Sequence, residues 1–212
     1  MNEALCKKTL MIDKLNQIHW SKLSHAYGEA SDVPTLIENL CAKDKDVFES
    51  SIYELFGNIW HQGTIYEATP KALPFLIYIY ENVEVIDKNS LLVLLASIAA
   101  GSGYHQIHSK ETFKNPFTGE ETNLPENLDN LLEAESAYVL ETQVLCKPLL
   151  EIFISNLTNS EPSVRESVAL ALGKYPSKAA ESIPKLEAVL LEEENEGVAT
   201  HIRDAICQLK NA

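Results

Sequence analysis

Two segments of this chain place imidazole, aromatic and carboxylate side chains within a few residues of one another. They cover residues 20–34 and 55–69, and a third group lies in residues 101–127. Side chains of these types bind ligands, transfer protons or anchor a protein partner. The candidate binding residues are Trp20, His25, Tyr27, Trp60, His61, Gln62, Tyr66, Glu67, Tyr104 and His105.

The six histidines lack the spacing of a metal or catalytic motif. His105 and His108 would share one face of a helix, but a metal site usually adds cysteines or carboxylates at ligand spacing. The sequence contains no His-Glu-x-x-His, no Gly-x-Ser-x-Gly and no glycine-rich phosphate loop. A serine near His105, such as Ser102 or Ser109, is a pairing that chance produces too often to count. We therefore predict no catalytic residue, no metal and no cofactor.

The candidate residues have structural interpretations beside the functional one. The indoles of Trp20 and Trp60 are suited to closing the contact between two helices. The imidazoles of His25 and His61 can bridge turns, since the ring both donates and accepts hydrogen bonds. If the aromatic groups are exposed together, they form a recognition patch. If Tyr27, His61, Tyr66, Glu67 and the insertion instead enclose a pocket, they favour a small-ligand binder or an enzyme.

The elements that must position these side chains are helices in a repeat. Pro34, Pro74, Pro148 and Pro184 each open an apolar run of helical period, at steps of 40, 74 and 36 residues. Two of these steps match one helical pair, and the longest fits one pair with an insertion. Second helices begin near Asp46, Pro162 and Gly197. In the second of these, Val164, Val168 and Leu172 follow the spacing of one helix face.

The pattern predicts an all-α fold in one domain, residues 1–212. A capping helix at about residues 4 to 18 precedes four helical pairs, stacked as a right-handed α-α superhelix of HEAT-like type. Residues 101–127 form an irregular insertion, and a long helix, Leu128 to Cys146, follows it. No strand is expected, and the β-prone run 75–80 is interpreted as a buried helix. Arg165 is expected to pair with an acidic turn residue of the adjacent unit.

Composition limits the partners. The formal net charge is −14 and the pI is about 4.8, which disfavours nucleic acid and, with it, a DNA-repair role, because phosphate contacts need clustered Lys and Arg. The longest apolar run, residues 91–100, is too short for a bilayer, and the first residues lack the apolar core of a secretion signal. The four cysteines are far apart, as expected of reduced thiols. We expect a cytoplasmic protein with no membrane segment.

The first 80 residues resemble a family of small bacterial HEAT-repeat proteins. The shared motifs are His-Ala-Tyr-Gly with Asp-Val-Pro, from His25 to Pro34, and His-Gln-Gly-Thr-Ile-Tyr, from His61 to Tyr66. The last third is similar only to the generic repeat, which also occurs in phycobilin lyase subunits. The resemblance implies an α-solenoid used for recognition, without established chemistry. We therefore expect a non-enzymatic module that binds a basic protein, either as a scaffold or as an immunity-like neutraliser of a toxin.

Overall fold

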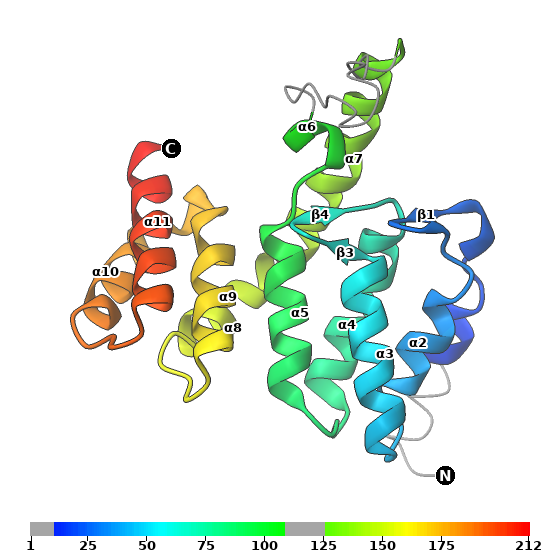
Figure 1. Cartoon of the computed structure of the whole chain (residues 1–212), viewed down its shortest axis with the longest axis horizontal. Helices are drawn as coiled ribbons and strands as arrows, with labels where there is room; N and C mark the ends of the chain where they lie inside the picture. The colour runs from blue at the N-terminus through cyan, green and yellow to red at the C-terminus, as the bar shows by residue number, and fades with distance from the viewer. Residues whose placement is uncertain (1–10, 109–125) are drawn as a thin grey trace, which may run out of the picture.

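The computed structural model describes residues 11–108 and 126–212 of the chain (Figure 1). Residues 11–15 are helical. The elements that follow are η1 (Trp20–Lys22), β1 (Ser24–His25), β2 (Gly28–Glu29), α2 (Val33–Asn39), α3 (Lys45–Asn58), β3 (Trp60–His61), β4 (Thr64–Ile65), α4 (Ala68–Asn82), α5 (Lys88–Ala100), α6 (Tyr104–His108), α7 (Leu128–Cys146), η2 (Lys147–Leu149), α8 (Leu150–Ser155), α9 (Pro162–Gly173), η3 (Pro176–Lys178), α10 (Ala179–Leu190) and α11 (Glu196–Asn211).

The predicted all-α class is confirmed, because helices dominate the described residues and form the core. Helices pack beside their chain neighbours, as α2 does on α3, α4 on α5 and α10 on α11. They also pack on the corresponding helix of the next pair. Thus α9 lies between α5 and α11, and α4 contacts both α2 and α7 (Figure 1). The part of the proposed insertion covered by residues 109–125, and the first part of the proposed capping helix, lie outside the described residues.

The helices form where the apolar period predicts them. In α9 the side chains of Val164, Val168 and Leu172 are all fully buried, and α11 buries its predicted stripe from Val198 to Leu209. The run 75–80 lies inside α4, as predicted, since a β-prone composition does not outweigh burial on a helix face. Side chains of Asp44, Asp87 and Asn195 accept backbone N–H groups at the starts of α3, α5 and α11.

The four prolines that the sequence places at the starts of apolar runs take different positions in the helices. Pro34 lies in the first turn of α2, where its missing N–H removes no helical hydrogen bond. Pro148 lies in η2, which separates α7 from α8, so the long helix ends and the chain bends there. Pro74 and Pro184 are inside α4 and α10.

Two expectations about the connections are wrong. The sequence predicts no strand, whereas β1 pairs with β2 and β3 with β4, each pair antiparallel with two residues per strand. The sequence also predicts an irregular insertion from residue 101 onward, whereas residues 104–108 form the short helix α6. Both errors concern segments of two to five residues, for which hydrophobic periodicity gives no signal because the segment is shorter than the window that it needs.

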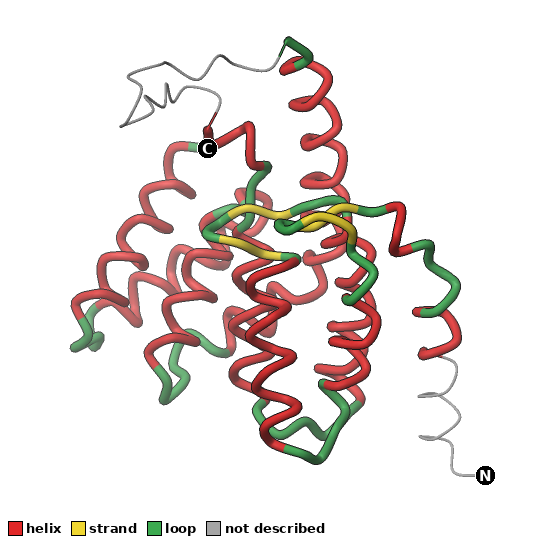
Figure 2. The backbone as a smooth tube through the Cα atoms, turned by 45° about the vertical axis from the view of Figure 1, so that its right-hand side comes forward, coloured by secondary structure: helices red, strands yellow, loops and turns green. Residues whose placement is uncertain are grey.

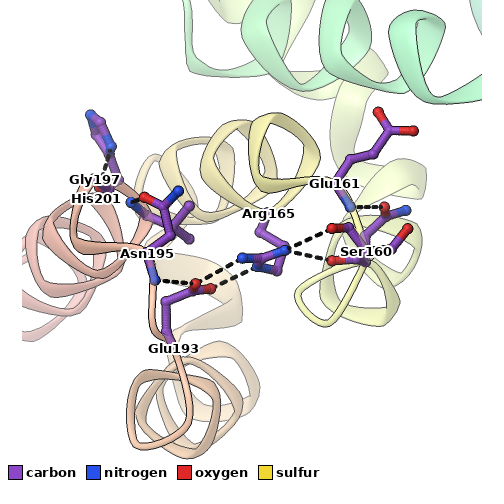
Figure 3. A network of polar contacts seen from close by, with 9 residues as sticks. Ser160, Glu161, Arg165, Glu193, Asn195, Gly197 and His201 are labelled. Carbon is purple, nitrogen blue, oxygen red and sulfur yellow. Dashed lines mark hydrogen bonds and ion pairs between the residues drawn. The ribbon is translucent and has the colours of Figure 1, made fainter.

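A polar network joins the segments at the starts of α9 and α11 (Figure 3). Arg165 donates two hydrogen bonds to the carboxylate of Glu193, at 2.6 and 2.7 Å. It also donates to the carbonyl of Asn159 at 2.8 Å, and Glu193 accepts from the backbone N–H of Asn195 at 2.9 Å. This confirms the prediction that Arg165 pairs with an acidic turn residue of the adjacent unit. The guanidinium therefore links two successive inter-helix turns.

The network continues toward α5. The amide of Asn89 donates to Glu161 at 2.7 Å, and the amide of Asn159 donates to the Asn89 side chain at 3.3 Å. Three consecutive helical pairs are thus connected at one end by side chains from their turns. These contacts are directional, so they fix the position of each helical pair along the helix axes of its neighbour. Apolar packing alone does not specify that position.

We predict that Glu193→Gln lowers the free energy of unfolding by about 2 kcal/mol at pH 7, because it leaves a largely covered guanidinium without its carboxylate. The hydrogen bonds from Arg165 hold the pKa of Glu193 below its usual range. A lowered pKa in the folded state stabilises the protein above the unfolded-state pKa, and this contribution is lost as the pH falls through the folded-state pKa. The difference from the unmutated protein in urea unfolding should therefore shrink between pH 7 and about pH 3.

The matched control is Arg203→Gln, which breaks the pair between Arg203 and Glu196 on α11. Those side chains are 52% and 79% exposed, whereas Arg165 and Glu193 are 15% and 3% exposed. An exposed ion pair contributes little to stability, so Arg203→Gln should change the free energy of unfolding by no more than about 0.5 kcal/mol. Equal losses for the two variants would show that the Arg165 network does not stabilise the stacking of the helical pairs.

Candidate functional site

The two hairpins lie across one end of the helices (Figure 2). The segment after α5 lies along the second hairpin: Ser102 forms a parallel bridge with Thr64, and the N–H of Ile65 donates to the Ser102 carbonyl at 3.0 Å. This layer holds all ten predicted binding residues, which occupy η1 (Trp20), β1 and its turn (His25, Tyr27), β3 and its turn (Trp60, His61, Gln62), the start of α4 (Tyr66, Glu67) and α6 (Tyr104, His105). The sequence segments that looked separate therefore meet in one place.

Some of these residues hold the layer together. Trp20 is buried, and its indole N–H donates to the Leu15 carbonyl at 2.9 Å, which closes a helix contact locally as the structural interpretation expects. His25 is also buried. Its Nδ1 accepts from the backbone N–H of Tyr27 at 3.0 Å, and its Nε2 lies 3.0 Å from the Asp32 carboxylate. His25 thus bridges the turn of the first hairpin.

Asp32 has a different role from the one its position suggests. It lies at the N-cap of α2, but its side chain makes no capping hydrogen bond. Its two carboxylate oxygens instead contact His25 and the amide of Asn58, which donates at 2.5 Å. The carboxylate therefore joins the first hairpin to the end of α3. A tertiary partner has replaced the local backbone donor that sequence reasoning assumes.

The second hairpin turns at Gln62 and Gly63, which have φ values of 50° and 92°. Two consecutive positive φ values suit the right-handed twist of a two-residue hairpin. Gly63 adopts the second of them without strain, because glycine has no Cβ. The Thr64 hydroxyl donates to the His61 carbonyl at 2.7 Å and lies 2.7 Å from the Tyr66 hydroxyl. The hairpin therefore fixes both the position and the direction of the Tyr66 ring.

Glu135 of α7 organises the segment that contains α6. Its carboxylate is buried and accepts from the backbone N–H groups of His105 and Gln106 at 2.9 and 3.1 Å. It also lies 2.7 Å from Nδ1 of His105. A Cβ added to Gly103 would lie 2.4 Å from this carboxylate, so only glycine allows the approach. The capping carboxylate comes from a helix about thirty residues further along the chain.

Four tyrosines and two glutamates lie near enough to one another beside these hairpins to interact electrostatically, and we call them the tyrosine–glutamate surface, of which Glu135 is the buried member: Tyr27, Tyr66, Glu67, Tyr104, Glu135 and Tyr138. Burial raises the pKa of Tyr66, and the nearby Tyr104, Tyr27 and Glu135 add to the rise, whereas the hydrogen bond between Tyr66 and Thr64 opposes it. Burial also raises the pKa of Tyr138, with further contributions from Glu135, Tyr66 and Glu67. The phenols therefore stay neutral beside the carboxylates.

The tyrosine–glutamate surface is open to a partner at its edge. Tyr27 is 69% exposed and Tyr104 is 45% exposed. Tyr27 packs edge-on against His61 with ring centroids 5.5 Å apart, and Tyr104 packs on His105 and His108. Glu67 is exposed and accepts from the hydroxyl and backbone N–H of Ser24. The surface thus offers aromatic faces next to carboxylate oxygens.

The electrostatic character of this surface favours a cation. Helices α3 and α5 end at the hairpin layer, so their C-termini direct partial negative charge toward it. The two carboxylates add to this, and the faces of phenol rings attract cations as well. Guanidinium and ammonium groups are the protein cations that match both features.

Trp60 faces a different part of the molecule. It packs edge-on against Phe56 and lines a cleft together with residues of α5, α9 and α11. That cleft and two others are lined by residues that do not include His61, Tyr66 or Glu67. The pocket that the sequence suggested between these side chains thus coincides with none of the three clefts.

Sequence reasoning missed Glu135 and Tyr138. Both lie in α7, far along the chain from the hairpins. One signal was present: Glu135 occupies the same helix face as Val139, Thr142 and Cys146, which are all buried. A carboxylate on an apolar face needs a polar partner, and this one finds its partners in the segment 104–106.

Residues 11–108 and 126–212 contain no group of three or more histidine, cysteine or acidic side chains placed to hold a metal ion. The helices within these ranges are too short or too polar to cross a bilayer. Comparisons with family models, with curated proteins and with solved structures find no match to this chain. The resemblance described from the sequence therefore stays an expectation.

We predict that Gly103→Ala lowers the free energy of unfolding by about 1–3 kcal/mol, because the new Cβ displaces the carboxylate that caps α6. The matched control is Gly57→Ala in α3, where the nearest atom would be Cε2 of Tyr27 at an ordinary 3.7 Å. Alanine in a helix interior is favoured over glycine, so this control should be unchanged or more stable by about 0.5 kcal/mol. Urea unfolding of both variants measures the contrast, and a neutral Gly103→Ala would show that Glu135 is not held in place by this approach.

Proposed function

We propose that this chain is a non-enzymatic recognition module that binds a basic protein partner, and that the tyrosine–glutamate surface is the contact. The chain would act as a scaffold or as an immunity-like neutraliser. The observation that carries the proposal is the convergence of four tyrosines and two glutamates from the hairpins, α6 and α7. These side chains come from four separate parts of the sequence, yet they form one electronegative aromatic surface.

Two effects would contribute to binding in different ways. The net charge of −14 attracts a basic protein over a distance and raises the association rate, but salt screens it beyond about 10 Å. Affinity depends instead on aromatic anchors that exclude water, where truncation of one side chain costs about 2 kcal/mol. The two exposed rings, Tyr27 and Tyr104, are the candidate anchors. The exposed carboxylate of Glu67 would orient a guanidinium or ammonium group over the phenol faces, while the buried Glu135 holds the α6 segment in place.

The architecture supports a recognition role. We propose that the stacked pairs form a right-handed HEAT-like superhelix, because α3, α5, α9 and α11 follow one another side by side while each also contacts its own pair partner. Stacked repeats hold their turns and end loops in a fixed array, which suits an extended contact with a protein. A DNA-repair role lacks support from charge, since the acidic residues outnumber the basic ones by 31 to 17.

The test compares a variant that should lose binding with a variant that should keep it. Tyr27→Ala with Tyr104→Ala removes the exposed rings of the tyrosine–glutamate surface, whereas Tyr53→Ala removes a ring that is 79% exposed on α3. The tagged protein recovers its partner from the source cells, and calorimetry with the purified partner then compares the three forms. We expect the double variant to bind about thirtyfold or more weakly, and the Tyr53 variant to bind as the unmutated protein does.

Two further results bear on the proposal. A recovered partner should be basic, and its affinity should fall as the salt concentration rises from about 0.05 M to about 0.5 M. Circular dichroism melting of each variant separates lost binding from lost folding. An acidic partner, or equal effects of the Tyr53 change and the double change, would contradict the assignment of this surface.

A further inference from the structure

The β3–β4 hairpin also borders a region that shares no residue with the tyrosine–glutamate surface. A cleft of about 300 Å³ lies there, between this hairpin, α5, α6, α9 and α11. Its lining is Trp60 and Gly63 from the hairpin, Ser97, Ala100 and Ser102 from the end of α5, Ile107 from α6, Ser167, Leu170 and Lys174 from α9, and Gln208 from α11. We call it the serine–lysine cleft. Its size is near the lower end of the range for small-ligand sites.

The polar side chains of this cleft are not used by the fold. The hydroxyls of Ser97, Ser102 and Ser167, the amide of Gln208 and the ammonium of Lys174 form no hydrogen bond or ion pair with any described residue. The hairpin layer differs, because there Thr64, Tyr66 and Glu67 bond to one another or to neighbours. Five hydrogen-bonding groups gathered around one cleft, and unpaired within residues 11–108 and 126–212, are available to a ligand.

Close packing of α9 on α11 places two of these groups together. A Cβ added to Gly173 would lie 2.9 Å from Oε1 of Gln208 and 3.1 Å from Cα of Ala205. Glycine at this position therefore lets the end of α9 approach α11. The next residue is Lys174, so the ammonium and the Gln208 amide reach the same cleft from two helices.

The charge in this cleft has the opposite sign to that of the protein as a whole. Among the described residues that line it, Lys174 is the one with a formal charge. The ends of α5 and α9 contribute partial negative charge, which favours a lysine there. The carbonyls of Ile98 and Ala171 near those ends, however, already accept N–H groups of Gly101 and Lys174 at 3.0 Å. The full positive charge of Lys174, on a flexible side chain, therefore outweighs the partial negative charges of the helix ends. The cleft attracts an anionic group.

We infer that the serine–lysine cleft binds an apolar group that ends in a carboxylate. The apolar part contacts Trp60, Ile107 and Leu170, and the carboxylate accepts hydrogen bonds from the Lys174 ammonium and from serine hydroxyls. Two sources offer this chemistry: the C-terminal residue of a peptide chain, and a free small carboxylic acid. The site does not depend on the proposed function, since none of its lining residues belongs to the tyrosine–glutamate surface.

The experiment titrates the full-length protein with three probes. The first is the pentapeptide N-acetyl-Gly-Ser-Gly-Ser-Leu with a free carboxylate, the second is the same peptide as its C-terminal amide, and the third is 4-methylpentanoic acid. Calorimetry gives the affinity. Tryptophan emission gives the location, because Trp60 lines the cleft whereas Trp20, the other of the two tryptophans, is buried in the core.

The expected result is binding of the free-carboxylate peptide with a change in emission, and at least tenfold weaker binding of the amide. Lys174→Gln should abolish this preference while leaving weak binding through the apolar wall. The control is Lys147→Gln, which removes an exposed lysine of η2 outside the cleft and should keep the preference. Trp60→Phe should lose the emission signal and retain most of the calorimetric affinity.

Each other outcome has a definite meaning. Equal affinity of the small acid and the peptide supports the site and assigns the free acid as its source, whereas tighter binding of the peptide assigns a chain end. Equal binding of the free-carboxylate peptide and its amide overturns the inference, and so does the absence of binding by all three probes. The inference is also overturned if Lys147→Gln reduces the preference for the free carboxylate as much as Lys174→Gln does.

Discussion

The helices of this chain have more apolar surface than one neighbour can cover. In α5, seven of the thirteen residues are buried, and they extend around most of the helix; α9 buries Val164, Val168, Ala169, Ala171 and Leu172. A helix that is apolar on more than one side must be covered by more than one partner. The pair α4–α5 alone cannot provide this, so α9 packs on α5 and α11 packs on α9. The linear order of the pairs follows from that requirement.

This order makes the two ends of the rows chemically different. At one end, the turns before α5, α9 and α11 carry the Asn89, Asn159, Arg165 and Glu193 contacts, and their polar groups are consumed in stacking. At the other end, the hairpins and α6 cover the ends of α3 and α5, and exposed tyrosines remain. We therefore propose the hairpin end for a functional contact, because exposed aromatic side chains can anchor a partner there.

The sequence was a good guide where periodicity extended over many residues. The limits of the helix from Leu128 to Cys146, the helix across 75–80 and the pairing of Arg165 with an acidic turn all follow from long apolar patterns or from a charge placed beside a turn. The second hairpin was missed because Gln62 precedes Gly63 in its turn, whereas the usual signal is Asn or Asp before glycine. Glu135 was missed because its partners, the N–H groups of residues 105 and 106, come from tertiary contact and leave no trace in local sequence.

The net charge of −14 explains less about recognition than its size suggests. Several lysines and arginines are paired with glutamates, as Lys71 is with Glu141 and Lys178 with Glu151 and Glu181, so the charge of these glutamates is locally neutralised. What a partner meets depends on the groups that stay unpaired. The same β3–β4 hairpin borders both the tyrosine–glutamate surface and a cleft with one lysine. A folded chain of one overall sign can therefore offer contacts of both signs, and the position of each is set by helix packing rather than by composition.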